Sequence, residues 1–273
     1  MWYHGDEVKR MFIIDGNAHC SMSHRCDEAP RQEYYFRHSH AGYEILYFLC
    51  GDAEYNIEGS VFRLRPHDLL VIQPARYHYL RLLSGAPYER YCSNFEGRIL
   101  PGEDGRLSTL PAVTNIADRP RMQECFARMD DYAARFDEAD RQLCVRMAVR
   151  EVLLLLLYDH PQETPDRARH NPLVDRIIAL VDAHPEGDWT AATLAKELYL
   201  SPSYIQNTFS RYMDIGLKQY INHKKILHAQ ALLLSGEKAT EVCEACGFRD
   251  YSTFFRLYRR LTGTTPGQAA ATL

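Results

Sequence analysis

The stretch EVCEACGFRDYSTFFRLYRRLTGTTP, residues 241–266, decides the fold of the C-terminal part of the chain. Apolar residues three and four apart predict a helix from about Thr240 to Gly247, where glycine can adopt the left-handed conformation that ends a helix. Asp250 can cap a second helix, whose apolar side carries Phe254. Helix, tight turn and helix with a polar outer face is the helix-turn-helix layout, which indicates contact with the DNA major groove.

A second stretch, WTAATLAKELYLSPSYIQNTFSRYM (residues 189–213), has the same layout. A helix from about Ala191 leads into a short turn. Ser201 can cap the next helix, with Pro202 at its first position, where a missing N–H costs nothing. A long amphipathic helix predicted for residues 217–235 joins the two stretches. One match in a helical region is weak support, but two joined in this way favour a double helix-turn-helix domain.

From about residue 172 to residue 266 the chain resembles the DNA-binding domain of AraC/XylS-type transcriptional regulators. The resemblance rests on LAKELYLSPSYIQNTF, on QYINHKKILHAQALLLSG, and on the pattern GF-x-D-x-S-x-F-x-R-x-[FY]-[KR]-[KR]-x-x-G-x-TP that begins at Gly247. The last pattern is highly specific. The resemblance therefore implies a regulator that binds double-stranded DNA.

Three departures from the family pattern leave the expected groove-facing side chains in place. Asp214 stands where the family usually has a glycine, and Lys225 replaces a usual arginine. Cys243 and Cys246 replace small apolar residues. Since positions three apart share a helix face, and no second CxxC or paired histidines follow at finger spacing, we interpret these cysteines as core residues rather than zinc ligands.

The resemblance implies that the two recognition helices enter successive major-groove turns, roughly 34 Å apart. Amide side chains pair well with adenine, arginine pairs well with guanine, and the methyl group of threonine can contact that of thymine. Lysine and arginine side chains that do not reach a base commonly bind the phosphates. The side chains expected at base edges are Ser203, Gln206, Asn207, Ser252, Thr253 and Arg256. Those expected at phosphates are Arg211, Lys218, Lys224, Arg259 and Arg260.

The charge of the chain restricts how it can hold DNA. The formal net charge is −4, which by itself argues against a nucleic-acid binder. From Pro172 onward eleven Lys and Arg face ten Asp and Glu, a net charge of +1, while the rest of the chain carries −5. DNA contact must therefore come from a local face rather than from a global field.

The N-terminal part reads as strands. From about residue 10 to about residue 100, short β-branched and aromatic segments are broken by Gly, Pro and Asp roughly every ten residues, as in a sandwich or small barrel. Helical periodicity begins near Asp118, and PQETPDRARHNP is Pro-rich and without periodicity. We therefore predict an α+β chain with a cupin-like β-barrel (jelly roll) at 1–117, a helical pair at 118–160, a linker at 161–171 and an all-α double helix-turn-helix domain at 172–273.

The second predicted helix of the pair, within residues 140–160, is apolar on two sides. One stripe contains Leu143, Met147, Leu154 and Leu157, and the other contains Val145, Val149, Val152 and Leu156. Such a helix needs two partners. We expect it to pack on its own barrel and on a second subunit, giving a homodimer; a helix buried wholly within the monomer is the alternative.

The stretch HSHAGYEILYFLCG, residues 38–51, carries His38, His40 and Glu44, and His78 follows downstream. This spacing resembles the cupin motif pair and the sensor domain that accompanies this DNA-binding domain. Period-two alternation predicts His38 and His40 on one strand face, with His78 on a distant strand. Three imidazoles and one carboxylate suit Zn, Ni, Mn or Fe.

Three functions compete for these four residues. They are a metal-dependent cupin enzyme, a regulator whose sensor holds a divalent metal, and a regulator whose barrel binds a small organic effector such as a sugar. The enzyme has no need of two helix-turn-helix units, and His67 stands where the second cupin motif usually has glycine, so we expect no enzyme. A barrel that only dimerises is a further alternative.

The expected partners and location follow from the resemblance and the composition. We expect an activator that binds DNA, a small-molecule effector, RNA polymerase and a second copy of itself. The chain shows no export signal, and its longest apolar run, Val152 to Tyr158, is too short to span a bilayer. We therefore expect a cytoplasmic protein without a membrane partner.

Overall fold

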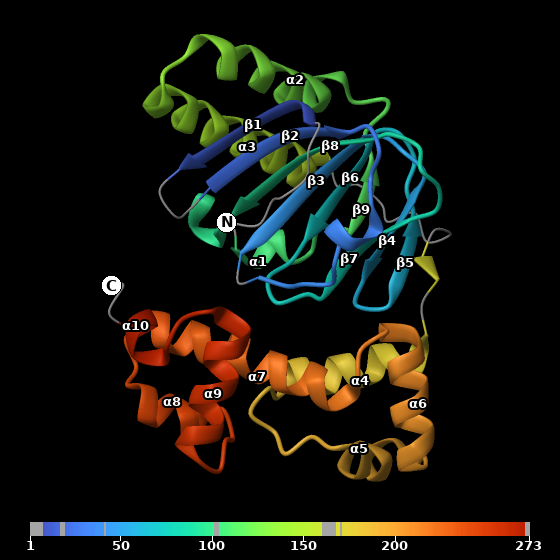
Figure 1. The fold of residues 1–273 in the computed structure, drawn as a ribbon, viewed down its shortest axis with the longest axis vertical. Helices are drawn as coiled ribbons and strands as arrows, with labels where there is room; N and C mark the ends of the chain where they lie inside the picture. The colour runs from blue at the N-terminus through green and yellow to red at the C-terminus, as the bar shows by residue number, and fades with distance from the viewer. Residues whose placement is uncertain are drawn as a thin grey trace. The chain divides into compact units, whose positions relative to one another are not determined.

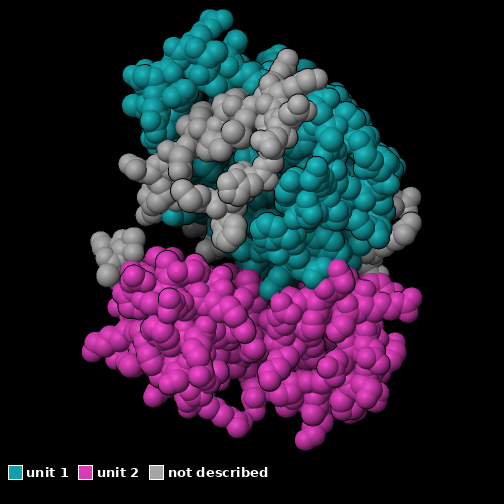
Figure 2. Space-filling view, viewed as in Figure 1, with its two compact units in different colours: residues 1–169 teal, residues 170–273 magenta. Residues whose placement is uncertain are grey.

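The computed structural model describes residues 8–16, 20–40, 42–100, 104–159, 168–169 and 171–270. The chain divides into two compact units, residues 1–169 (unit 1) and residues 170–273 (unit 2), which Figure 2 colours separately. Unit 1 combines two sheets with two long helices, and the described part of unit 2 is helical (Figure 1). The predicted α+β class is confirmed.

Unit 1 contains two antiparallel sheets, with the strand orders β1-β2-β8-β3-β6-β9 and β10-β5-β4-β7. The strands are β1 Val8–Gly16, β2 Cys20–Asp27, β3 Tyr43–Cys50, β4 Ala53–Ile57, β5 Ser60–Arg63, β6 Asp68–Ile72, β7 His78–Leu82, β8 Tyr88–Phe95, β9 Val113–Asn115 and β10 Ala168–Arg169. The helices are α1 Asp104–Leu107, α2 Pro120–Arg135 and α3 Glu138–Asp159, with short 3-10 turns at Gln32–Tyr34 and Gly97–Ile99.

Strand β3 lies between two apolar cores. Leu46 and Phe48 face a core shared by the two sheets, because alternate side chains of a strand point to opposite faces. Ile45 and Tyr47 face the other core, where α2 and α3 cover the larger sheet (Figure 1). Strand β3 is consequently buried on both sides, and its residue Glu44 is buried as well.

Helix α3 buries one stripe on unit 1 and exposes another. Leu143, Met147 and Leu154 are 50%, 59% and 39% exposed, so the helix is not buried wholly within the chain. Leu157, which we placed on the same stripe, is buried, and that assignment is wrong. Tyr158 is exposed instead.

Two residues of the predicted linker form a strand. Ala168 and Arg169 make up β10, which pairs antiparallel with Phe62 and Val61 of β5. The last predicted linker residue, Asn171, caps α4, and residues 161–167 and 170 lie outside the described residues. No strand pattern in the linker predicts this pairing, since two residues are too few to show alternation.

Unit 2 consists of helices α4 Pro172–Ala183, α5 Ala191–Leu198, α6 Pro202–Met213, α7 Leu217–Leu234, α8 Ala239–Ala245, α9 Tyr251–Thr262 and α10 Pro266–Ala270. The two predicted turns are confirmed. Tyr199 and Gly247 are left-handed, with φ of 57° and 69°. Ser201 and Asp250 cap α6 and α9 by accepting hydrogen bonds from backbone N–H groups of the first turn. No helix in the described ranges has the length and apolar character needed to cross a bilayer.

Candidate functional site

Helix α6 turns an apolar side inward and a polar side outward. Ile205 and Phe209 are completely buried. The opposite side exposes the four residues predicted to contact DNA, Ser203, Gln206, Asn207 and Arg211. Asp214 ends the helix in the left-handed conformation, with φ of 51°. A short aspartate tolerates this conformation better than most residues, which explains how the chain manages without the usual glycine.

Helix α9 repeats this division. Phe254 is fully buried, and Leu257 and Tyr258 are nearly so. The outer side exposes Ser252, Thr253, Arg256 and Arg259. Both second helices of the double helix-turn-helix domain therefore present the predicted side chains to solvent.

Of the remaining cations predicted at phosphates, the structure exposes two and buries one. Lys218 and Arg260 are exposed. Lys224 is only 5% exposed, and its Nζ lies 2.9 Å from Oδ1 of Asp182. The expectation that Lys224 contacts phosphate is therefore wrong, because its ammonium group forms an ion pair that links α7 to α4. Arg249, an exposed cation in the turn before α9, belongs to no motif and was not predicted as a DNA contact.

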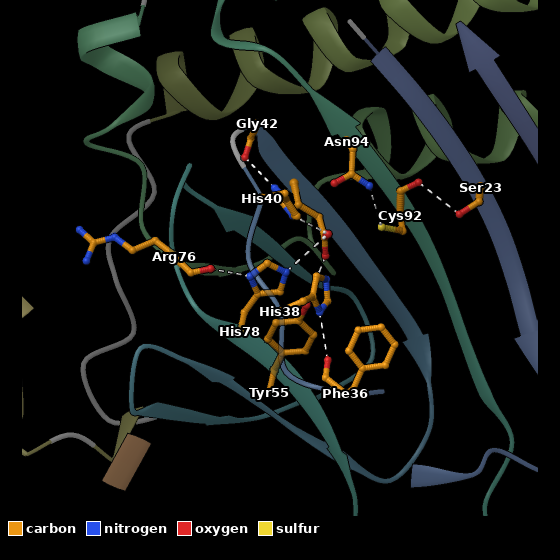
Figure 3. Close-up of polar contacts among 11 residues, drawn as sticks. Ser23, Phe36, His38, His40, Gly42, Tyr55, Arg76, His78, Cys92 and Asn94 are labelled. Atoms are coloured by element: carbon orange, nitrogen blue, oxygen red, sulfur yellow. Dashed lines mark hydrogen bonds and ion pairs between the residues drawn. The ribbon is translucent and has the colours of Figure 1, made fainter. Parts of the chain in front are cut away.

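In unit 1 the four predicted pocket residues come together. One possible ligand atom from each of His38, His40, Glu44 and His78 lies within 4.8 Å of the others. Glu44 comes from β3 and His78 from β7, and both are buried. Figure 3 shows the three imidazole rings turned toward one another.

The predicted shared strand face of His38 and His40 is wrong. His38 makes only an isolated β-bridge with His78, through hydrogen bonds of 3.1 Å and 2.9 Å, and His40 lies outside the strands. The bridge places His38 beside His78 of β7, and His40 lies next to Glu44. The cluster thus depends on backbone pairing between distant segments, which spacing alone does not reveal.

The hydrogen bonds of the three histidines define which ring nitrogen points inward. Nδ1 of His38, His40 and His78 lies 3.0 Å, 2.8 Å and 2.8 Å from the backbone carbonyl oxygens of Phe36, Gly42 and Arg76. A carbonyl only accepts, so each Nδ1 carries the proton and donates it. In the neutral ring Nε2 is then an acceptor, and it is this atom that faces Glu44 in His40 and His78.

This arrangement places acceptors against one another. Glu44 Oε2 lies 3.2 Å from Nε2 of His40 and 3.7 Å from Nε2 of His78. Nε2 of His78 is buried and has no hydrogen-bond partner among the described residues. Lone pairs that converge in this way repel unless a proton or a cation lies between them. The donor set therefore fits a divalent cation.

The ionisation of the cluster follows from burial and from its charges. Burial alone would raise the pKa of Glu44, but His40 and His78 outweigh it and hold that pKa well below its usual value. The residue His38 is exposed as a whole, but desolvation of its ring within the cluster lowers its pKa. For His40 the hydrogen bond and charge of Glu44 outweigh burial and raise the pKa. Glu44 is thus a carboxylate, which also accepts a 3.2 Å hydrogen bond from the hydroxyl of Tyr55.

Two family models match the chain in separate stretches. An AraC-like ligand binding domain matches residues 22–143, and a helix-turn-helix domain matches residues 194–272. Together they account for both units, and the chain belongs to the AraC family of transcriptional regulators.

The chain is also similar to several regulatory proteins. The thermoregulatory protein LcrF of Yersinia pestis is 28% identical over 252 residues, which cover 86% of this chain and 90% of that protein. The uncharacterized HTH-type transcriptional regulator YijO of Escherichia coli is 33% identical over 102 residues, 37% of this chain. The matches cover 36% of YijO and 56% of the regulatory protein PocR of Salmonella typhimurium, about a third and about half of those proteins.

Among solved structures, ToxT of Vibrio cholerae matches 93% of this chain and 98% of its own at 11% identity, with a TM-score of 0.39.

Proposed function

We propose that the protein is a sequence-specific DNA-binding regulator of transcription, acting as an activator, in which unit 2 reads the duplex and unit 1 senses a ligand. The observation that carries this is the pair of second helices, α6 and α9, whose polar sides are exposed and whose apolar sides are buried. The protein would work in the cytoplasm on chromosomal DNA, with RNA polymerase as a partner and without enzymatic activity.

Selection from a pool of random-sequence duplexes tests the DNA-binding part. The expected product is a duplex with two short conserved blocks whose centres lie about one helical turn, roughly 10 bp, apart. Variants Gln206→Ala and Arg256→Ala should each relax a different block. A pool that shows no enrichment after repeated rounds, with no duplex bound, would contradict the proposal.

For the ligand of unit 1, the inward-facing acceptors favour a divalent metal ion. His38, His40 and His78 would hold it through Nε2 and Glu44 through its carboxylate, while the backbone carbonyls keep each Nδ1 proton in place. A metal of this kind would supply a positive centre to which an organic effector could also bind. Small polar effectors without metal, held by the same groups through hydrogen bonds, remain the competing proposal.

Metal analysis of the purified protein separates these two proposals. We expect about one equivalent of a transition metal or zinc, lost in His78→Ala and retained in His184→Ala, which removes an exposed histidine of unit 2. Metal-free protein whose melting temperature rises with a sugar or organic acid, and not with Zn, Ni, Mn or Fe, would favour the organic effector.

We also propose that the exposed stripe of α3 joins two copies of the chain. Successive members of the set Leu143, Met147, Leu154 and Tyr158 lie four or seven residues apart, and all four are exposed. Met147→Glu should convert a dimer to a monomer in sedimentation analysis, because it places a charge within an apolar contact. The control is Arg146→Glu, one position away on the same helix. Equal masses for wild type and Met147→Glu would exclude this face.

A further inference from the structure

Two consecutive lysines of α7, Lys224 and Lys225, are buried in unit 2, at 5% and 7% exposure. Lys224 forms its ion pair with Asp182 of α4. Lys225 instead lies between the two helix-turn-helix halves. Its Nζ donates hydrogen bonds of 3.4 Å and 3.2 Å to the backbone carbonyl oxygens of Glu186 and Gly247. Glu186 lies in the loop that leads into α5, and Gly247 lies in the turn between α8 and α9.

The turn between α8 and α9 packs closely around the ammonium group. A Cβ added at Gly247 would lie 2.9 Å from Nζ of Lys225. The same Nζ lies over the ring of Phe248, the next residue of the turn, at 5.7 Å from its centroid. A cation in this position is attracted to the ring face. Lys225 therefore holds the turn of the second half through a carbonyl oxygen and a ring, and the loop of the first half through another carbonyl oxygen.

An apolar residue would fill this position at a lower cost in free energy. The buried ammonium group loses hydration, which lowers the pKa of Lys225. Methionine is also long and unbranched, and it could occupy the same space without a charge. Filling space therefore does not account for the lysine. What the lysine adds is the pair of hydrogen bonds that joins the two halves.

Helix α7 is the other connection between the halves. At one end Tyr220 packs on Phe209 of α6, with ring centroids 5.1 Å apart, and at the other end Leu233 packs in the core of the second half. A single helix can bend, so a link beside its axis restricts the motion of one half relative to the other. Arg249 and Asp188 also span the halves, at 3.7 Å, but both side chains are exposed and such pairs contribute little.

We propose that Lys225 is a positioning residue that sets which spacing between the two DNA blocks the protein accepts. The inference rests on the proposed DNA-binding function. By holding the turn before α9 on the loop before α5, Lys225 fixes the distance and the angle between α6 and α9. One base pair moves a block by about 3.4 Å along the duplex and about 35° around it, so a small movement between the halves decides which spacing fits.

The affinity of the full chain for three duplexes tests this role. They are the selected duplex and two versions in which one base pair is inserted or deleted between the blocks. Wild type should bind the altered duplexes about tenfold more weakly, because one block is then out of register with its helix. Lys225→Met should reduce this preference to about threefold or less, because the halves lose their shared hydrogen bonds.

Two further substitutions at this position separate the hydrogen bonds from the side-chain volume. Lys225→Arg should keep the wild-type preference, because a guanidinium group can also donate to two carbonyl oxygens. Lys225→Gln has a shorter, neutral donor and should lower the preference, and it replaces Lys225→Met in the test should that variant not fold.

Val242→Ala is the control for stability, because Val242 is completely buried in the core of the second half. It should lower the stability in urea unfolding and keep the wild-type spacing preference, since Lys225 keeps its hydrogen bonds. The salt slope, which is the slope of log K against log salt, should be the same in Lys225→Met and wild type, because a buried ammonium group neutralises no phosphate.

A Lys225→Met variant that loses stability but keeps the wild-type spacing preference would overturn the inference. A salt slope reduced by about 1 in this variant would also overturn it, because the ammonium group would then contact a phosphate. Wild type that binds the selected duplex and both altered duplexes equally well would overturn the inference and leave sequence-specific DNA binding standing. Wild type that binds no duplex would overturn both.

Discussion

The two helix-turn-helix halves share one layout but differ in charge. Helix α6 presents the neutral Ser203, Gln206 and Asn207, and its sequence contains a single cation, Arg211. Helix α9 contains three arginines, and the turn before it contains Arg249. Neutral amides discriminate between bases, whereas arginines also neutralise phosphates. We therefore propose that the first half contributes sequence discrimination and that the second half contributes most of the electrostatic attraction to DNA.

The turns of the two halves also differ in what surrounds them. Tyr199 ends α5 in the left-handed conformation and is 94% exposed. At Gly247 an added Cβ would lie 2.2 Å from the carbonyl oxygen of Glu186. The second turn is therefore pressed against the loop of the first half, whereas the first turn is open. This contact makes the separation of α6 and α9 a property of the packing.

The largest effect on stability is expected from a substitution that disrupts the contact between Gly247 and Glu186. Gly247→Ala combines a left-handed conformation with a backbone clash, and should lower the free energy of unfolding by about 2–4 kcal/mol. Tyr199→Gly removes a left-handed tyrosine and should change it by less than about 1 kcal/mol. Urea unfolding followed by circular dichroism measures both. Equal losses in the two variants would mean that the turns are equivalent after all.

Substitutions on the polar sides of α6 and α9 should have an intermediate effect, and they test whether the two halves differ in how they contact DNA. Arg256→Ala and Gln206→Ala should each cost about 1–3 kcal/mol on the selected duplex, since each removes a side chain that we propose contacts a base. Gln206→Ala should leave the salt slope unchanged because the amide is neutral. Fluorescence anisotropy titrations at several salt concentrations give both quantities. A loss that is the same on selected and scrambled DNA would place either side chain at the backbone only.

The smallest expected effect concerns the caps. A hydrogen bond from the Thr253 side chain, with one from its backbone N–H, lowers the pKa of Asp250 below its ordinary 3.8. Because the folded-state pKa is lower, this cap stabilises fully above about pH 4 and is lost as the pH falls through the folded-state value. Ser201 caps the first half and does not titrate there. Wild type should lose more stability than Asp250→Ser between pH 5 and pH 3, by urea unfolding; parallel losses would show that the cap carries no charge effect.

Residue type and helical periodicity predicted most of the helix ends and buried positions of the two helix-turn-helix halves in unit 2. The caps at Ser201 and Asp250, the left-handed Gly247 and the buried Phe254 all follow from residue type and helical period. These features depend on neighbours within one turn of helix, so the sequence contains them directly. The exposure of the predicted DNA contacts follows from the same periodicity.

The errors come from contacts between distant segments. Lys224 was predicted at the surface because its ion pair with Asp182 of α4 depends on tertiary packing. Arg249 lies in a turn that belongs to no motif, and its place in the lining of a hollow beside α7 also depends on tertiary packing. His38 reaches the cluster through a bridge to His78, forty residues away, rather than through a strand. Such pairings are set by tertiary packing, which residue spacing does not encode.

The central claim is that α6 and α9 read neighbouring turns of one DNA face at a separation fixed by the protein. Its most direct test is the affinity of the full chain for the selected duplex with 5 bp or 10 bp inserted between the two blocks. Because 5 bp is about half a helical turn, that insertion should reduce affinity to the level of a duplex with only one block. The 10 bp insertion also moves the blocks too far apart and should weaken binding in the same way. Undiminished affinity for both inserted duplexes would contradict the claim.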